Sequence, residues 1–112
     1  MRDTNERLLD IQEAIGRIEK YAAQGRDAIE RDELIQTWIL HHLQIIGEAV
    51  RALPLIFRNQ HPEVPWSKAI GLRHILVHHY FAIDFEAVWS VVERDLPELK
   101  LQIDAILEKD QT

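Results

Sequence analysis

The chain has 112 residues, of which 46% are apolar and 29% are charged, and it carries a formal net charge of −6 and no cysteine. These values fit one globular domain spanning residues 1–112, and they exclude disulfides, thiolate metal sites and the basic surface of a protein that coats nucleic acid. The charged N-terminus does not look like a signal peptide, and no apolar run approaches the roughly 20 residues that span a bilayer, so we expect a cytoplasmic protein without a membrane partner.

The first predicted helix begins after an N-cap at Asp3, where Glu6 follows three residues later as in a capping box. Its apolar residues recur at steps of three and four, which is the period of an amphipathic helix. They are Leu8, Ile11, Ile15, Ile18 and Ala22. Gly25 is a suitable stop signal, so the sequence predicts that this helix ends before it.

The second predicted helix runs from about Asp32 to Leu53, ahead of Pro54. Two apolar stripes cover about half of its circumference, so we expect it at the centre of a bundle. One stripe is Leu34, Trp38, Ile45 and Ala52, and the other is Ile35, Ile39, Leu43, Ile46, Val50 and Leu53.

Polar residues and a glycine interrupt the apolar pattern of this second helix. His41 and Glu48 border the first stripe, so we expect His41 to be more buried than its neighbour His42. Gly47 lowers the helix propensity, but it permits the close approach of another backbone.

The middle of the chain predicts a connection followed by two helices. Three of the four prolines lie within residues 54–65, which we interpret as a link with one helical turn near Leu55–Asn59. A third helix is expected from Trp66 to His78, and Asp84 is a suitable N-cap for a helix over residues 85–94.

A final helix is predicted at the C-terminal end. Pro97 fits its first turn or a kink that leads into it. The apolar face of this helix is Leu96, Leu99, Ile103, Ile106 and Leu107. Because the sequence has no strand pattern and no internal repeat, the predicted fold is an all-α, up-and-down bundle of four or five helices.

Arg73 does not fit a simple packing helix. On a helical wheel it falls within about 60° of Trp66, Ile70 and Val77, in the middle of the apolar face. A guanidinium stays charged, so burying it without a partner costs several kcal/mol. Three explanations remain open: an ion pair with Glu48 inside the monomer, a place at an oligomer interface, or a phosphate site, which suits the planar fork of arginine.

A metal site is a weaker interpretation of the histidines. His74 and His78 are four residues apart, the spacing of two metal ligands on one helix face. Histidines near a helix C-terminus, however, also interact well with the last carbonyls and the helix dipole. A third ligand would have to come from histidines outside any recognised metal motif, namely His41, His42, His61 and His79. We therefore expect no metal.

Arg73 and His78 are five residues apart, which places them about 140° from each other on a straight helix. They converge only if the helix loosens or if a second copy contributes across a two-fold axis. Such a site could cleave a phosphodiester without metal, because histidine can move the proton of a ribose 2′-hydroxyl and arginine can hold the phosphate. In this acidic chain an RNA contact needs a local basic patch, for which residues 73–80, Arg51 and Arg58 are the candidates.

The motif R-x4-H-x-Y, formed by Arg73, His78 and Tyr80, resembles the signature of the HEPN superfamily, in particular its HepT-like toxins. The resemblance extends along nearly the whole chain. The other similar segments are, in order, LLDIQEAIGRIEKY, LQIIGEAVRAL, HPEVPWSKAIGLRHILVHHYFAIDFEAVW and DLPEL.

This resemblance implies an all-α, two-fold dimer with a composite cleft at its interface and metal-independent cleavage of RNA. Carried over, Arg73 and His78 are the catalytic pair. In toxin–antitoxin pairs of this type VII kind, a small MNT-type nucleotidyltransferase antitoxin uses ATP and Mg²⁺ to transfer AMP to the motif tyrosine, here Tyr80. The chain itself would need no cofactor, and its partners would be a second copy, the antitoxin and RNA.

Two further positions are expected to support the site. His74 stands where these proteins usually have asparagine, so it either replaces that polar contact or adds a second titrating group. Glu48 matches a family position, and we expect it to pair with or orient Arg73. The alternative function is a non-catalytic helical partner or nucleotide-binding module of a small nucleotidyltransferase, which the acidic composition slightly favours; a histidine-based metal hydrolase is a third hypothesis.

Overall fold

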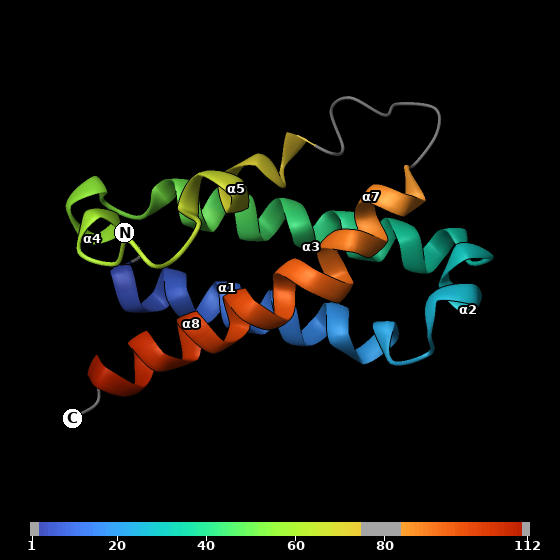
Figure 1. Ribbon diagram of the computed structural model, residues 1–112, viewed down its shortest axis with the longest axis horizontal. Coiled ribbons are helices and arrows are strands. Elements are labelled where there is room, and N and C mark those ends of the chain that lie inside the picture. Colours follow the sequence, from blue (N-terminus) through green and yellow to red (C-terminus); the bar gives the residue numbers. More distant parts are fainter. Residues whose placement is uncertain (1–2, 75–83, 111–112) are drawn as a thin grey trace.

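The computed structural model describes residues 3–74 and 84–110, and in this part of the chain all regular secondary structure is helical, without a strand (Figure 1). The elements are α1 (Thr4–Ala22), α2 (Arg26–Glu30), α3 (Glu33–Ala52), α4 (Leu55–Asn59), α5 (Trp66–Gly71), α7 (Phe85–Ser90), the π-helical segment η1 (Val91–Asp95) and α8 (Leu96–Asp110). The predicted all-α class is confirmed.

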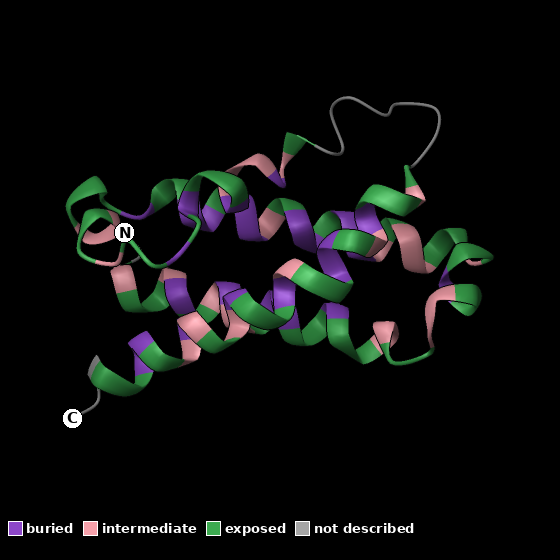
Figure 2. Cartoon of the chain, viewed as in Figure 1, coloured by how far each residue is buried: buried purple, intermediate pink, exposed green. Residues whose placement is uncertain are grey.

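The long helices alternate in direction, as expected for an up-and-down bundle. In Figure 1, α1 and α5 run one way along the long axis, while α3 and the continuous run from α7 to α8 return. Helix α1 packs against both α3 and α8, and buried residues lie along all three helices (Figure 2). The largest fully buried side chains are Leu8, Ile11, Ile15, Ile18, Ile29, Ile39, Leu43, Ile46, Val50, Leu53, Leu96 and Ile103. They form one core, which holds the site-bearing elements in place.

Aspartate side chains cap three helices, and two of these caps, Asp3 and Asp84, were predicted from the sequence. Each carboxylate accepts a hydrogen bond from the backbone N–H three residues on, at 2.8 to 3.1 Å, and so satisfies a donor that a helix start leaves free. These caps are Asp3, Asp32 and Asp84. After α1, Gly25 has φ 93°, a left-handed conformation that favours glycine.

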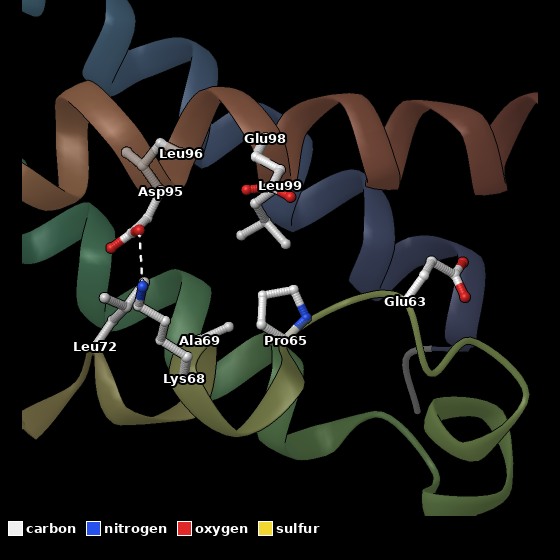
Figure 3. Close-up of a pocket in the computed structure, with 9 residues that line it drawn as sticks. All are labelled: Glu63, Pro65, Lys68, Ala69, Leu72, Asp95, Leu96, Glu98 and Leu99. Atoms are coloured by element: carbon white, nitrogen blue, oxygen red, sulfur yellow. Dashed lines mark hydrogen bonds and ion pairs between the residues drawn. The ribbon is translucent and has the colours of Figure 1, made fainter.

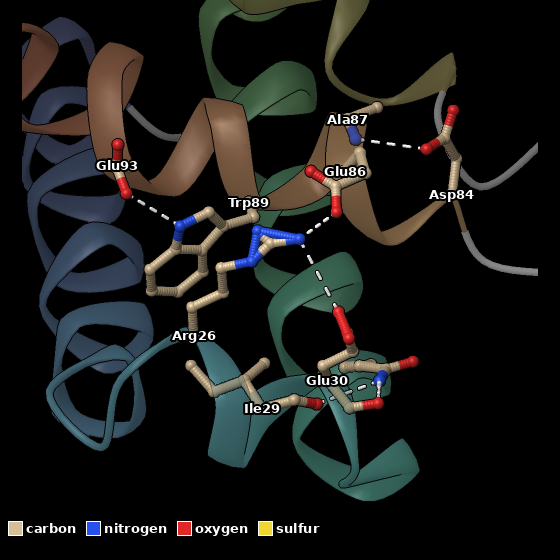
Figure 4. A network of polar contacts seen from close by, with 9 residues as sticks. Arg26, Ile29, Glu30, Asp84, Glu86, Ala87, Trp89 and Glu93 are labelled. Carbon is tan, nitrogen blue, oxygen red and sulfur yellow. Dashed lines mark hydrogen bonds and ion pairs between the residues drawn. The ribbon is translucent and has the colours of Figure 1, made fainter.

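The short helix α2 was not foreseen, and it carries a contact between distant parts of the chain. The Arg26 guanidinium pairs with Glu86 on α7 and lies 3.6 Å from Glu30 (Figure 4). It also sits over the Phe85 ring at 5.4 Å. Arg26 therefore links α2 to the first turn of α7, the helix that follows residue 83.

The predicted third helix is shorter than expected within the described residues. Helix α5 ends at Gly71, and Leu72 and Arg73 lie in a turn. The amides of Leu72 and Arg73 donate to the carbonyls three residues back, Ala69 and Ile70, at 3.1 and 3.4 Å. Glycine has low helix propensity, which fits a tightened helix end at this point. Residues 75–83, which include the end of the predicted helix and the stretch that follows it, lie outside the described residues.

The C-terminal third combines a helix with a π-helical turn. The expected N-cap at Asp84 is present, but the predicted helix of residues 85–94 continues through η1 into α8. The Leu96 amide donates to the Val91 carbonyl, five residues back. Pro97 lies in the first turn of α8, where it has no N–H to bond residue 93, so the wider turn accommodates the proline without ending the helix.

The burial of α3 differs from the prediction on one side. Leu34 is 83% exposed, whereas the second predicted stripe faces the core. His42, not His41, is the buried histidine, because its Nδ1 lies 2.7 Å from the Trp38 carbonyl and its ring packs 4.4 Å from the Trp38 ring. His41 is exposed.

Candidate active site

Arg73 and Glu48 form the polar centre of the candidate site. Glu48 projects from α3, and Arg73 projects from the turn that follows α5. Arg73 Nη1 donates to Glu48 Oε1 at 3.2 Å, with the arginine side chain 25% exposed and the glutamate side chain 52% exposed. The predicted pairing of these two residues is therefore present within one chain.

Gly47 allows this pair to form. An ideal Cβ on Gly47 would lie 3.0 Å from Arg73 Cβ and 3.1 Å from both Arg73 N and the Ile70 carbonyl oxygen. Real Cβ atoms rarely come so close to backbone, so the α3 backbone and the end of α5 meet at a distance that only glycine permits without movement. The close approach predicted for Gly47 is confirmed, and its partner is the segment that carries Arg73.

The arginine fork is only partly used by Glu48. Arg73 Nε is buried and has no hydrogen-bond partner among the described residues. A guanidinium offers five donors in a planar fork that matches two oxygens of a phosphate or carboxylate. Arg73 is thus held at one nitrogen by Glu48, while its Nε remains without a described acceptor. Glu48 therefore uses only part of the donor capacity of the guanidinium, and a quarter of the Arg73 side chain is exposed.

The other predicted site residues divide between exposed and undescribed positions. His74 directly follows Arg73 and is exposed. His78 and Tyr80, predicted as catalytic residue and modification site, lie outside the described residues. Within residues 3–74 and 84–110, no group of three or more histidine, cysteine or acidic side chains could hold a metal ion.

A hollow of about 260 Å³ between α5 and the η1–α8 junction was not predicted (Figure 3). Its floor is apolar, and Lys68 spans it to reach Asp95 at 2.9 Å, with Glu63 and Glu98 at its walls. Neither Arg73 nor Glu48 lines this hollow, so it is separate from the candidate site.

Within the described part of the chain, no helix combines the length and the apolar character that crossing a membrane requires.

The family model described as ribonuclease HepT-like matches residues 11–106 of the chain. A provisionally named RNase from Caldanaerobacter subterraneus subsp. tengcongensis is 34% identical, over 90% of this chain and 90% of its own. A second, from Methanocaldococcus jannaschii, is 33% identical over 94% and 97% of the two chains. A provisionally named ribonuclease HepT from Thermococcus cleftensis is 37% identical over 83% and 86%. No solved structure matches the chain.

Proposed function

The chain belongs to the HepT-like ribonuclease family, and on this premise we propose that it is a metal-independent RNA endonuclease that acts as the toxin of a type VII-like toxin–antitoxin pair. The observation that carries the proposal is the state of Arg73, which Glu48 holds at Nη1 while a quarter of its side chain remains exposed. A guanidinium positioned in this way is suited to grip a phosphate.

In the proposed reaction the ribose 2′-oxygen attacks the adjacent phosphorus, and the bond from phosphorus to the 5′-oxygen breaks. The products are a 2′,3′-cyclic phosphate and a free 5′-hydroxyl. His78 removes the 2′-hydroxyl proton, and a histidine delivers a proton to the leaving 5′-oxygen. Arg73 stabilises the negative charge that develops on the non-bridging oxygens. No metal or cofactor of the chain itself takes part.

The proposed active unit is a two-fold dimer. Arg73 lies in a turn, and its side chain is already three-quarters buried within a single protomer. A second copy would bring another arginine and histidine to the same cleft, which gives the reaction one histidine as base and another as acid. The proposed interface includes the region of residues 66–80.

We propose that the ribonuclease activity is switched off by adenylylation of Tyr80, carried out by a cognate MNT-type nucleotidyltransferase. The phenolic oxygen attacks the α-phosphorus of Mg²⁺-bound ATP, pyrophosphate leaves, and the phenolic proton passes to a base of the partner enzyme. The phosphodiester formed carries a negative charge that can pair with Arg73 and a nucleoside that occupies the place of RNA.

The proposal is tested by incubating the purified chain with end-labelled RNA in the presence of EDTA. We expect fragments that end in a 2′,3′-cyclic phosphate, and none from Arg73→Ala or His78→Ala proteins that keep a helical circular-dichroism spectrum. Cleavage that EDTA abolishes would contradict the metal-free mechanism. A chain that cleaves nothing but binds the nucleotidyltransferase would favour the non-catalytic partner instead, a function with which the net charge of −6 is compatible.

A further inference from the structure

A groove runs along the boundary of α1 and α3 and ends at Glu48. It consists of two adjoining hollows, of about 320 and 380 Å³, which share Asp10, His41 and Ile45. Trp38 lines the first hollow, and Glu48 lines the second. We refer to both together as the α1–α3 groove. Because Glu48 also binds Arg73, a ligand that reaches Glu48 in this groove is one side chain away from the guanidinium.

The end of the groove that is distant from Glu48 offers flat aromatic surfaces. The rings of Trp38 and His42 are 4.4 Å apart, and those of His42 and His41 are 5.2 Å apart at 89°. The Trp38 indole donates to the Arg17 carbonyl at 3.1 Å, and His42 is fixed by its contact with the Trp38 carbonyl. These bonds hold the wall rigid, while His41 is exposed and lines both hollows. Unpaired RNA bases bind to such surfaces by stacking.

The end near Glu48 offers unused hydrogen-bonding groups. Gln44 is exposed, and its amide makes no hydrogen bond to another described residue. The half-buried Arg7 guanidinium likewise pairs with no described residue. A glutamine amide can read the edge of a base, and an arginine can bind a phosphate.

The charge of the groove restricts what can lie along it. Its lining includes the carboxylates Asp10, Glu13 and Glu48 against the guanidinium groups of Arg7 and Arg17. Glu13 is paired with Arg17 at 2.9 Å, so the one arginine of the lining without a described partner is Arg7, near Glu48. A phosphate backbone would be repelled along most of this surface, whereas an uncharged, flat base would not.

We propose that the α1–α3 groove is a base-binding subsite for single-stranded RNA. A base next to the cleaved phosphate stacks on His41, Gln44 hydrogen-bonds to its edge, and Arg7 binds the neighbouring phosphate. This inference rests on the proposed ribonuclease function, because it assigns Arg73 to the cleaved phosphate and the groove to the adjoining nucleotide.

The test measures binding without cleavage. Fluorescence anisotropy is recorded with labelled 2′-O-methyl oligonucleotides of A, C or U, which lack the attacking hydroxyl. His41→Ala should weaken binding by about fivefold to a hundredfold, the effect of losing one stacked base. Leu34→Ala is the matched control, since Leu34 is 83% exposed on the same helix and lines neither hollow. Its affinity should equal that of the unmodified chain.

An oligonucleotide with a single abasic position supplies the second arm. At one position the abasic site should weaken binding to the unmodified chain by the same factor as His41→Ala, and combining the two should add little more. If Arg73→Ala weakens binding but His41→Ala, Gln44→Ala and Arg7→Ala do not, the groove assignment is wrong and the ribonuclease proposal stands. If the unmodified chain neither binds nor cleaves RNA, both are wrong. If His41→Ala instead shifts sedimentation from dimer to monomer, a second copy covers the groove and the inference is overturned.

Discussion

Gly47 lies so close to Arg73 that a side chain added at position 47 would collide with it. An added Cβ on Gly47 would lie 3.0 Å from Arg73 Cβ and 3.1 Å from Arg73 N. Because Gly47 directly precedes Glu48, the same contact sets the distance between the Glu48 carboxylate and the Arg73 guanidinium, which is 3.2 Å. The position of the Arg73 guanidinium therefore depends on Gly47, a residue without a side chain.

Gly47→Ala should destabilise the fold and reduce ribonuclease activity. Alanine raises helix propensity by up to about 1 kcal/mol, but here the new methyl meets backbone atoms that cannot rotate away. Overpacking typically costs about 1 to 3 kcal/mol, so after the gain in helix propensity the free energy of unfolding in urea should fall by up to about 2 kcal/mol.

Gly16→Ala is the matched control for that experiment. Gly16 lies in α1, and an added Cβ there has nothing within 4 Å. Only the gain in helix propensity remains, so this variant should be more stable by about 0.5 to 1 kcal/mol and keep full activity. A Gly47→Ala protein that is stabilised like Gly16→Ala, with unchanged activity, would show that α5 moves without consequence for Arg73.

Substitutions at Glu48 should separate the orientation of Arg73 from its charge. Glu48→Gln retains an oxygen that can accept from Arg73 and removes a negative charge beside the expected phosphate. Its RNA affinity should equal or exceed that of the unmodified chain. Glu48→Ala removes the acceptor, so Arg73 loses its fixed position and RNA binding should weaken.

The stability of both Glu48 variants should change by less than about 1 kcal/mol, because the Glu48 side chain is 52% exposed and such pairs contribute little. Anisotropy and urea unfolding on the same samples measure the two effects. Equal losses of RNA affinity in Glu48→Gln and Glu48→Ala would show that the carboxylate charge itself is required.

Arg73→Lys should be as inactive as Arg73→Ala while the bundle remains helical. Lysine keeps the positive charge but lacks the planar fork that reaches two oxygens and the Nε that is unpaired among the described residues. Product formation from labelled RNA measures the activity. Full activity in Arg73→Lys would mean that a simple positive charge is enough and that the proposed phosphate grip is wrong.

Local signals account for the parts of the fold that the sequence predicted. Asp3 and Asp84 were recognisable as caps, and Asp32 as a helix start, because the side chain, the helix start and the bonded amide lie within three residues. Helix α2 was missed because it has five residues, of which only Ile29 is buried, so it has no apolar stripe. The burial of His42 follows from its place in the second stripe, three residues after Ile39 and four before Ile46, which the prediction overlooked. The exposure of Leu34 depends on which helices pack against the start of α3, which periodicity does not reveal.

The sequence also predicted one part of the candidate site, the contact between Arg73 and Glu48. The charge of Arg73 among apolar neighbours called for a partner, and an ion pair with Glu48 was one of the three explanations that the sequence left open; the structure contains that pair. The α1–α3 groove and the Lys68–Asp95 hollow were not predictable, because their walls come from helices far apart in the sequence.

Arg26→Ala should loosen α2 and α7 from each other. It removes the ion pairs with Glu86 and Glu30 (Figure 4) and the contact with the Phe85 ring. The Arg26 side chain is 38% exposed, so the loss should stay near 1 kcal/mol in urea unfolding. Amide hydrogen exchange should accelerate in α2 and in the first turn of α7 but not in the centre of α3. Arg17→Ala, which removes an exposed pair within α1, should leave the exchange of α7 unchanged.

Tyr80→Phe should keep ribonuclease activity and escape the antitoxin. A phenol ordinarily has a pKa of about 10, so it is not needed to move a proton at neutral pH, and its loss should leave at least part of the cleavage. Without the phenolic oxygen no AMP can be attached, so neither the negative charge of its phosphate nor its bulky nucleoside can block the RNA. Cells that produce Tyr80→Phe together with the nucleotidyltransferase should therefore stop growing, whereas cells with the unmodified pair should grow and yield a chain whose intact mass is increased by AMP.

Tyr21→Phe is the control, because it removes the other tyrosine hydroxyl of the chain and should leave both growth and the AMP adduct unchanged. Full protection of the Tyr80→Phe cells, with no adduct on the protein, would show that the antitoxin neutralises the chain by binding alone.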